Sequence, residues 1–482
     1  MKDNDLGKSI FRSISWLGLG KIISQGFSWV VTLVIASLLD PSAYGLMALS
    51  TIISGYAEIL SELGFGPAII QKQDVSQQEL SSIHWISIVI GVLMFAACWP
   101  LSYLTFSLFK ESNTVAVTKA VGIIFVLSGC QVVPMALLRK NMQFKTIAII
   151  EVISVLISSS LMLVIAKAGG GVWSLAGGRI SVSFSKALLV TLYGGWRPSW
   201  WLRLKDVRSY FAFGLSMTFA RSTFYLWEKS DRYFAGLFWK TSNLGLYTFA
   251  LQLAQMPTEK IVTLINQVLY SGMAQVKDDP VSFNKLYLSS TRYTAIVVIP
   301  LFTIGYLFSS ELITVFLNPK WLPITSLFSY LCLGQILLAL NASNNFVHAA
   351  LGRPYFGLIF HVVCLALMPL SFRIAAPYGY NAYAYPWLIT YSLISVAWII
   401  ITLKTIKVPL LQYLSSVRSA IACSLVMVMV VKLSKISQAT FISGLSVTTG
   451  LCVNLAIALV VYATLLLSLE KDFCKNIAAL RR

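Results

Sequence analysis

Apolar segments of about 20 residues recur along almost the whole chain, from residue 16 to residue 469, and only short polar connections separate them. A helix of about 20 residues is long enough to cross the hydrocarbon core of a bilayer. Of the 482 residues, 57% are hydrophobic and only 11% are charged, well below the charged fraction of soluble domains. The sequence therefore predicts an all-α integral membrane protein without a sizeable soluble domain.

We expect about 14 transmembrane helices, each read from one apolar segment. The expected spans cover residues 13–38, 43–62, 80–108, 115–138, 146–167, 172–195, 210–238, 244–272, 287–309, 324–350, 355–376, 380–403, 416–435 and 441–468. A basic, Trp-rich connection at 196–208 divides the first twelve into two groups of six. We therefore expect an N-terminal six-helix lobe at 1–200, a C-terminal six-helix lobe at 201–408, and an additional helix pair with a cytoplasmic tail at 409–482.

When the sequence is compared with itself at an offset of about 200 residues, the two predicted lobes align. The motif Ser-x-x-Gly-Leu occurs around Gly45 and again around Gly245, at the starts of the second and eighth spans. The same shift aligns Lys21 with Arg221, so each lobe carries a cation at the same depth of its first helix. Parallel repeats are a known plan of transporters that bind their substrate between the halves. The repeat thus predicts two pseudo-symmetric lobes with these cations facing a shared cleft.

A charged helical face lies inside an otherwise apolar expected span. Its members follow at spacings of four, three and four residues, which places them on one side of a helix: Arg221, Tyr225, Glu228 and Arg232. Lys229 and Asp231 lie beside them. A charge at mid-bilayer costs roughly 2.5 to 3.5 kcal/mol, so such a cluster needs partners or a water-filled cavity. The face is typical of a transport pathway; the alternative is that 228–232 forms a short loop in water between two spans.

Further charges at expected membrane depth extend this prediction. Arg179 shares a helical face with Ser183 and Lys186 in the sixth span. We predict that four cations line a substrate-binding cavity: Lys21, Arg179, Arg221 and Arg232. Three acidic residues are candidates for coupling or charge pairing: Glu58, Glu228 and Asp231. Because the forked guanidinium suits phosphate oxygens, a cavity with a surplus of cations predicts an anionic cargo.

The distribution of Lys and Arg predicts the orientation. With the N-terminus in the cytoplasm, we assign roughly 21 of these residues to cytoplasmic ends, about 8 to the outside and about 8 to membrane depth. Both termini are therefore expected in the cytoplasm. A formal net charge of +19 would suggest nucleic acid in a soluble protein, but here it is explained by topology anchors at the span ends, and we expect no nucleic-acid partner.

Several kinds of chemistry lack their motifs. No Gly-x-x-x-x-Gly-Lys-Ser/Thr loop occurs, so transport is not expected to be powered by ATP on this chain. The seven cysteines show no paired spacing, and the three histidines lack zinc-ligand spacing. Large polar external loops, which a membrane polymerase or ligase for polysaccharides would need, are absent from the sequence. We therefore expect no catalytic residue, no metal and no cofactor.

Five short passages, spread over most of the chain, carry a family resemblance: 38–45, 61–71, 136–144, 244–247 and 316–321. In these passages the chain resembles the polysaccharide-transport branch of the multidrug/oligosaccharidyl-lipid/polysaccharide exporter superfamily, and within it the colanic-acid-exporter type of Wzx flippase. The resemblance implies two six-helix lobes in a V shape, similar to multidrug (MATE) exporters, with a central cationic cavity and alternating access. The C-terminal helix pair resembles the extra pair of lipid II flippases.

The resemblance also implies a function and a setting. The cargo would be an undecaprenyl-pyrophosphate-linked oligosaccharide for O-antigen, capsule or exopolysaccharide, flipped across a bacterial inner membrane by a protein that is not an enzyme. We carry the cationic cavity over to Lys21, Arg179 and Arg221. Expected partners are the lipid-linked substrate, membrane lipid, and the polymerase and chain-length proteins of the same pathway. The alternatives are a multidrug cation antiporter of the same superfamily and a polysaccharide polymerase or ligase.

Overall fold

The computed structural model describes residues 26–62, 64–72, 74–262, 265, 272–273, 275–353, 355–441 and 446–470. Nearly all of these residues lie in helices, and no β-strand occurs among them. Within these ranges, 11 helices are long and apolar enough to cross a membrane. The predicted all-α membrane class is confirmed.

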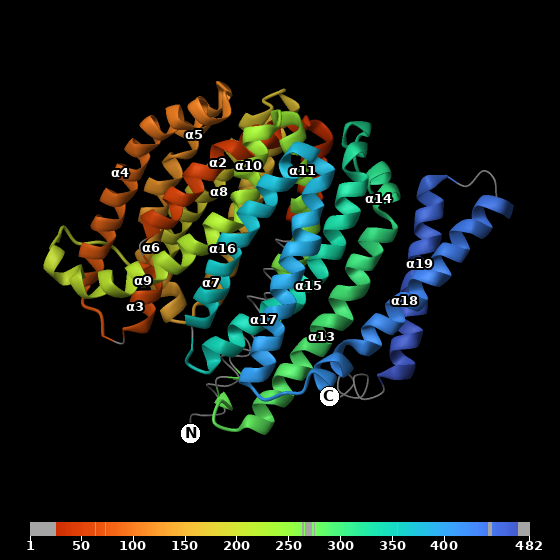
Figure 1. Cartoon of the computed structure of the whole chain (residues 1–482). Helices are drawn as coiled ribbons and strands as arrows, with labels where there is room; N and C mark the ends of the chain where they lie inside the picture. The colour runs from red at the N-terminus through yellow and green to blue at the C-terminus, as the bar shows by residue number, and fades with distance from the viewer. Residues whose placement is uncertain are drawn as a thin grey trace. The chain divides into compact units, whose positions relative to one another are not determined.

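The chain divides into two compact units, Met1–Gly245 and Leu246–Arg482, and the helices of each can be followed in Figure 1. The first unit begins with a short apolar helix, Gly26–Leu38. Its further helices are α2 (Pro41–Glu62), α3 (Phe65–Gln71), α4 (Gln77–Phe109), α5 (Asn113–Val121), α6 (Ile123–Lys140), α7 (Phe144–Lys167), α8 (Val172–Tyr193), α9 (Leu204–Glu228), α10 (Ser230–Phe238) and the start of α11 (Thr241–Pro257). The lobe boundaries expected at residues 200 and 408 remain predictions.

After α11, the described residues of the second unit form seven α-helices and several short 3-10 and π helices. The helices are α13 (Pro280–Leu307), α14 (Ser309–Phe316), α15 (Thr325–Ala350), α16 (Tyr355–Ala375), α17 (Tyr391–Thr405), α18 (Leu410–Phe441) and α19 (Val447–Leu469). The short π helices are η1 (Thr258–Val262) and η5 (Pro386–Thr390), and the short 3-10 helices are η2 (Pro319–Ile324), η3 (Ala376–Tyr378) and η4 (Tyr380–Tyr383). The additional helix pair expected after residue 409 is present as α18 and α19.

The expected count of about 14 spans is not confirmed, and three segments explain the difference. The first, 13–38, is described only in its second half. The seventh, 210–238, is divided at Lys229 into α9 and α10, and α9 contains too many Ser, Thr, Tyr and charged residues to reach the hydropathy of a span. The eighth, 244–272, is helical in α11 and then passes through η1 into residues outside the described ranges.

The basic connection between α8 and α9 packs on the first turns of α4. Trp196 Nε1 donates a hydrogen bond to Gln77 Oε1 at 2.7 Å, and Gln77 Nε2 donates to the carbonyl oxygen of Arg197 at 2.8 Å. Trp85 Nε1 donates to the carbonyl oxygen of Ser199 at 2.9 Å. The start of this connection is therefore fixed within the first unit.

Apolar packing holds α9 in the first unit. Phe65 and Ile69 of α3 belong to one buried cluster with Ile83 of α4, Val133 of α6 and Val207 of α9. Inside a bilayer such contacts stabilise by van der Waals packing, because lipid tails are as apolar as the side chains. This cluster holds the first turns of α9 in the first unit, and further along its length α9 also contacts α2.

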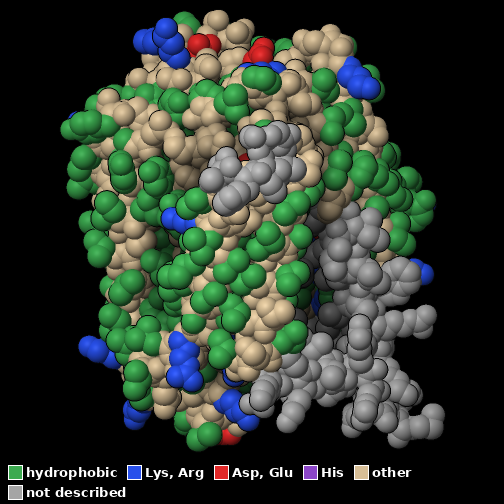
Figure 2. Space-filling model, turned by 90° about the vertical axis from the view of Figure 1, so that its right-hand side faces the viewer, with side chains coloured by type: hydrophobic (Ala, Val, Ile, Leu, Met, Phe, Trp, Pro, Cys, Tyr) green, Lys and Arg blue, Asp and Glu red, His purple; other side chains and the backbone are tan. Residues whose placement is uncertain are grey.

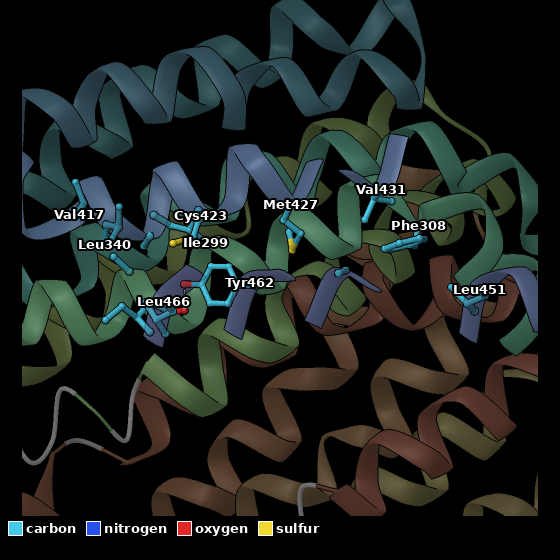
Figure 3. Close-up of a cluster of buried hydrophobic side chains, with 14 residues drawn as sticks. Ile299, Phe308, Leu340, Val417, Cys423, Met427, Val431, Leu451, Tyr462 and Leu466 are labelled. Atoms are coloured by element: carbon cyan, nitrogen blue, oxygen red, sulfur yellow. Dashed lines mark hydrogen bonds between the residues drawn. The ribbon is translucent and has the colours of Figure 1, made fainter. Parts of the chain in front are cut away.

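The helix pair of the second unit packs on α13. α13, α18 and α19 meet in an apolar cluster that includes Ile299 and Met427 (Figure 3). Tyr462 of α19 lies in the same cluster, and its hydroxyl donates to the carbonyl oxygen of Ile296 at 2.7 Å. The buried hydroxyl of Tyr462 therefore has a hydrogen-bond partner, as most buried polar groups do.

The surface agrees with a position in a membrane. Figure 2 shows a face on which hydrophobic side chains dominate, while most Lys and Arg side chains in view lie toward its upper and lower ends. An apolar belt between charged ends matches the hydrocarbon core and its two interfaces.

The two glycines that the repeat aligns, Gly45 and Gly245, meet where α2 and α11 begin. A Cβ atom on Gly45 would lie 1.8 Å from the carbonyl oxygen of Thr241, and one on Gly245 would lie 1.7 Å from the carbonyl oxygen of Pro41. Neither position has room for a Cβ, so the two helices approach backbone to backbone. The strongest match of the repeat thus corresponds to a reciprocal contact inside the first unit.

Candidate functional site

The predicted charged face is helical on both sides of a single turn residue. α9 carries Arg221, Tyr225 and Glu228 and ends there, Lys229 forms the turn, and α10 begins at Ser230. Ser230 is buried. The alternative predicts a break within 228–232, and the structure has one, but it is a single turn residue between two helices instead of a short loop; the role of this face in transport stays a prediction.

Tyr225 fixes α9 against α2. Its hydroxyl donates a hydrogen bond that is shared between the carbonyl oxygens of Thr51 at 2.8 Å and Ile52 at 2.9 Å. Gly55 leaves room for the ring, since a Cβ there would lie 2.3 Å from the hydroxyl oxygen of Tyr225. The ring of Tyr56 lies next to it, with centroids 6.1 Å apart. Tyr225 is therefore a positioning residue for the charges on either side of it.

Four of the predicted site residues surround this tyrosine. Arg179 Nη2 of α8 lies 3.5 Å from Glu58 Oε2 of α2, and the two side chains are 43% and 35% exposed. The hydroxyl of Tyr225 lies within electrostatic range of this pair and also of Glu228 and Arg232. The fold thus brings together charges from α2, α8, α9 and α10 that are far apart in the sequence.

The junction of α9 and α10 holds a second group of charges. Asp231 is fully buried, and its carboxylate accepts a hydrogen bond from the backbone N–H of Arg232 at 2.5 Å. Lys229 Nζ lies 2.8 Å from Glu228 Oε1 and within electrostatic range of Arg232 and Asp231. Positive and negative groups largely balance here, which lowers the cost of holding them among apolar helices.

Two further cations, Arg221 and Lys186, lie on α9 and α8. Arg221 is exposed on α9, one helical turn before Tyr225. Lys186, which shares a helical face with Arg179, is half-buried. Lys21 lies outside the described residues. A common cavity formed by these cations remains a prediction.

The arrangement favours an anion that carries phosphate oxygens. Among the described site residues, four cations accompany three carboxylates: Arg179, Arg221, Lys229 and Arg232 with Glu58, Glu228 and Asp231. An ion pair as exposed as that between Arg179 and Glu58 contributes only about 0 to 1 kcal/mol, so a phosphate can replace its carboxylate at little cost. In the described part of the chain, no group of three or more His, Cys, Asp or Glu could hold a metal ion.

Sequence reasoning found the charges but missed their partners. It did not pair Glu58 with Arg179, although opposite charges at the same expected depth are a usable signal. It also missed the carbonyl oxygens that receive the hydroxyl of Tyr225, because a backbone acceptor leaves no trace in the sequence. Gly55 is the residue that could have indicated a close approach to α2.

Comparison with known proteins decides the family. The family described as "Polysaccharide biosynthesis protein" matches residues 34–326, which is more than half of the chain. The chain belongs to this family. As predicted from the five passages, this polysaccharide biosynthesis family member is related to Wzx-type transporters of the exporter superfamily.

Two curated relatives of this family member are known by name. It is 25% identical over 346 residues to the teichuronic acid biosynthesis protein TuaB of Bacillus subtilis (strain 168), covering 71% of this chain and 69% of TuaB. It is 24% identical over 328 residues to the lipopolysaccharide biosynthesis protein WzxC of Escherichia coli (strain K12), covering 67% of this chain and 66% of WzxC.

Two solved structures share its fold. The lipid II flippase MurJ in an inward closed conformation matches with a TM-score of 0.72 and 14% identity, over 94% of this chain and 99% of MurJ. An inward-facing multidrug resistance MATE transporter matches with a TM-score of 0.63 and 12% identity, over 81% of this chain and 98% of that one. At such identities the likeness concerns the fold, and the predicted MATE-like exporter fold is confirmed.

Proposed function

We propose that this protein is a flippase that moves an undecaprenyl-pyrophosphate-linked oligosaccharide across the bacterial inner membrane. The cargo is a repeat unit of O-antigen, capsule or exopolysaccharide. The names of TuaB and WzxC, together with the fold shared with the lipid II flippase MurJ, support this proposal. The observation that carries it is that Arg179, Glu58, Glu228 and Arg232 all lie within electrostatic range of Tyr225, inside a unit built of apolar helices.

The proposed binding step is an exchange of partners. A pyrophosphate approaching Arg179 takes the place of Glu58, whose oxygen is already 3.5 Å away and partly exposed. Arg221 and Arg232 then add further positive charge, and Lys21 is assigned to the same cavity by the family resemblance. The carboxylate that is released can accept a proton or a cation, which gives Glu58 a coupling role; Glu228 and Asp231 are proposed to pair charges nearby. The prenyl tail stays in lipid while alternating access exposes the headgroup on the other side.

The orientation and partners belong to the same proposal. Both termini lie in the cytoplasm, as the distribution of Lys and Arg favours. The protein carries no catalytic residue and no cofactor, and a polymerase with chain-length proteins uses the flipped units. A polymerase or ligase can be distinguished by experiment. Loss of such an enzyme makes lipid-linked units accumulate on the outer side of the membrane, whereas loss of a flippase makes them accumulate on the inner side.

The test is the flipping of lipid-linked oligosaccharide in proteoliposomes. Arg179→Gln, Arg221→Gln and Arg232→Gln are each expected to lower the rate about tenfold or more, because a hydrogen bond to a charged group contributes about 1.5 to 3 kcal/mol. Arg373→Gln is the matched control, since it removes an exposed arginine from the last turn of α16. Normal flipping by all three variants would refute the cation role. Efflux of a cationic dye by the unmodified protein would instead favour a multidrug antiporter.

A further inference from the structure

The second unit contains a cationic pocket of its own. It has a volume of about 1140 Å³ and is formed by the start of α13, the segment before α18, the first turns of α18 and the end of α19. Its charged lining consists of four basic residues and one carboxylate: Lys285, Arg292, Lys407, Arg418 and Glu470. The proposal for transport uses none of these residues.

The carboxylate of Glu470 already has two partners within the protein. Glu470 is buried, accepts a hydrogen bond from Ser419 Oγ at 2.5 Å, and forms an ion pair with Arg292. Lys285, Lys407 and Arg418 are exposed at the same pocket. The pocket therefore keeps a net positive charge that its single acid does not cancel.

A hydrogen bond holds two of the segments that line the pocket together. Asn284 Nδ2 donates to the carbonyl oxygen of Ile406 at 3.1 Å, which ties α13 to the segment that leads into α18. Pro409 and Gln412, at the start of α18, line the pocket. Helix ends of both signs meet at the pocket, since α13 and α18 begin there and α19 ends there, so its net positive charge comes from the side chains.

The rim of the pocket is apolar. Val281 and Leu469 line it and are 79% and 58% exposed, and Leu411 at the start of α18 is 78% exposed. Exposed apolar side chains next to a basic pocket suit a molecule with an anionic head and hydrocarbon tails, whereas a soluble anion needs no such rim. Basic pockets between transmembrane helices are known to bind the headgroups of anionic lipids.

We propose that this pocket binds the phosphate headgroup of a membrane lipid. The shared chemistry is a phosphate ester at the membrane surface, carried either by an anionic phospholipid or by a polyprenyl pyrophosphate. The headgroup is held by Lys285, Lys407 and Arg418, and its chains lie over the exposed leucines of α18 and α19. Glu470 keeps Arg292 in place at the base of the pocket.

The experiment measures lipid binding to the full-length protein in detergent by native mass spectrometry. The probes are cardiolipin, farnesyl pyrophosphate and phosphatidylcholine. The triple variant Lys285→Gln/Lys407→Gln/Arg418→Gln is compared with the control Arg197→Gln/Lys205→Gln/Arg208→Gln, which removes three exposed cations from the first unit. The pocket variant is expected to bind at least one anionic probe on the order of 100-fold more weakly, while the control changes less than about threefold.

Each outcome is decisive. Loss of cardiolipin alone identifies a phospholipid as the ligand, and loss of farnesyl pyrophosphate alone identifies a polyprenyl pyrophosphate; either supports the proposal. Unchanged binding of both, or an equal loss of phosphatidylcholine, overturns it. An unaltered midpoint of thermal unfolding shows that the variant is folded. All proteins compared also carry Arg179→Gln and Arg232→Gln, so that farnesyl pyrophosphate bound at the proposed transport site does not mask the result, and failure of the transport proposal leaves it interpretable.

Discussion

At the scale of single residues, the charges of the first unit differ in how firmly they are held. The Asp231 carboxylate is fully buried and accepts a hydrogen bond from the backbone N–H of Arg232, so its position is fixed. Arg179 and Glu58 are 3.5 Å apart and partly exposed, so solvent screens their attraction. A binding site needs the second kind of group, because only a weakly paired cation can accept a ligand without leaving a carboxylate buried and alone.

The change Glu58→Gln tests this distinction. It is expected to shift the free energy of unfolding by less than about 1 kcal/mol, since the pair is partly exposed. It should nevertheless tighten the binding of farnesyl pyrophosphate several-fold, because Arg179 loses its competitor, whereas Arg179→Gln should weaken it. Isothermal titration calorimetry with farnesyl pyrophosphate measures the dissociation constants of both variants. Weaker binding by Glu58→Gln would contradict the proposed exchange.

The change Tyr225→Phe tests the positioning role of the hydroxyl. Removing its hydrogen bond to Thr51 and Ile52 is expected to cost about 0.5 to 1.5 kcal/mol of stability and to slow flipping, since α9 is then less firmly held on α2. Tyr56→Phe removes a hydroxyl from the neighbouring ring and is the control. A positioning role requires that flipping falls for Tyr225→Phe at temperatures where the variant is fully folded.

The sequence predicts which residues share one side of α9, but it does not predict which residues of other helices this side contacts. Helical periodicity alone places Arg221, Tyr225 and Glu228 on one side, and the structure keeps them on one helix. The partner of Arg179 is 121 residues away in the chain, and such a pairing is decided by tertiary packing. The break at Lys229 lies within the segment 228–232, for which a short loop is the alternative prediction, but no Pro or Gly marks its exact position.

At the scale of helices, the contact of α2 with α11 is set by two small residues. The sequence repeat aligns Gly45 with Gly245, but an alignment of two segments does not show whether they are in contact. In the structure each would place a Cβ less than 2 Å from a carbonyl oxygen of the other segment, 1.8 Å and 1.7 Å respectively. Backbone atoms cannot move aside as a flexible side chain can, so this crossing tolerates no larger residue.

The changes Gly45→Ala and Gly245→Ala are therefore expected to destabilise the protein by about 1 to 3 kcal/mol each, as overpacking does. Gly66→Ala is the matched control, because it lies in α3 and a Cβ there meets nothing within 4 Å. In α3 the alanine gains helix propensity, so the control should be neutral or stabilising. The measurement is thermal unfolding in detergent, and equal midpoints for all three variants would contradict the close crossing.

At the scale of the whole chain, hydropathy predicted the class and most spans, and one of the three spans that are not confirmed is the segment with the charged face. The seventh expected span, 210–238, carries the charged site, and the same polar residues that form the site lower its hydropathy below that of a span. The uniformly apolar helices, such as α7 and α19, have no such conflict and agree with their expected spans. In this one segment the departure from the apolar pattern coincides with the candidate site, whereas the other two unconfirmed spans, 13–38 and 244–272, run into residues outside the described ranges.

The C-terminal helix pair is attached to the second unit at both ends as well as along its length. Its middle packs in the apolar cluster of Figure 3. At one end Glu470 pairs with Arg292 of α13, and at the other Lys435 of α18 pairs with Glu311 of α14. Lys435 Nζ also donates to the carbonyl oxygen of Leu307 at 2.8 Å. A pair of helices that merely floated beside the bundle would not need charged groups at both ends.

A double-mutant cycle on the second of these pairs tests the attachment. Lys435→Met and Glu311→Gln are each expected to lower the free energy of unfolding by about 1 to 3 kcal/mol, because both groups are mostly buried and each leaves the other without its charged partner. The double variant should cost less than the sum, since the second substitution removes a group that has already lost its partner. Thermal unfolding of the four proteins in detergent measures the coupling. Strictly additive losses would mean that the two residues act separately and that the apolar cluster alone holds the helix pair in place.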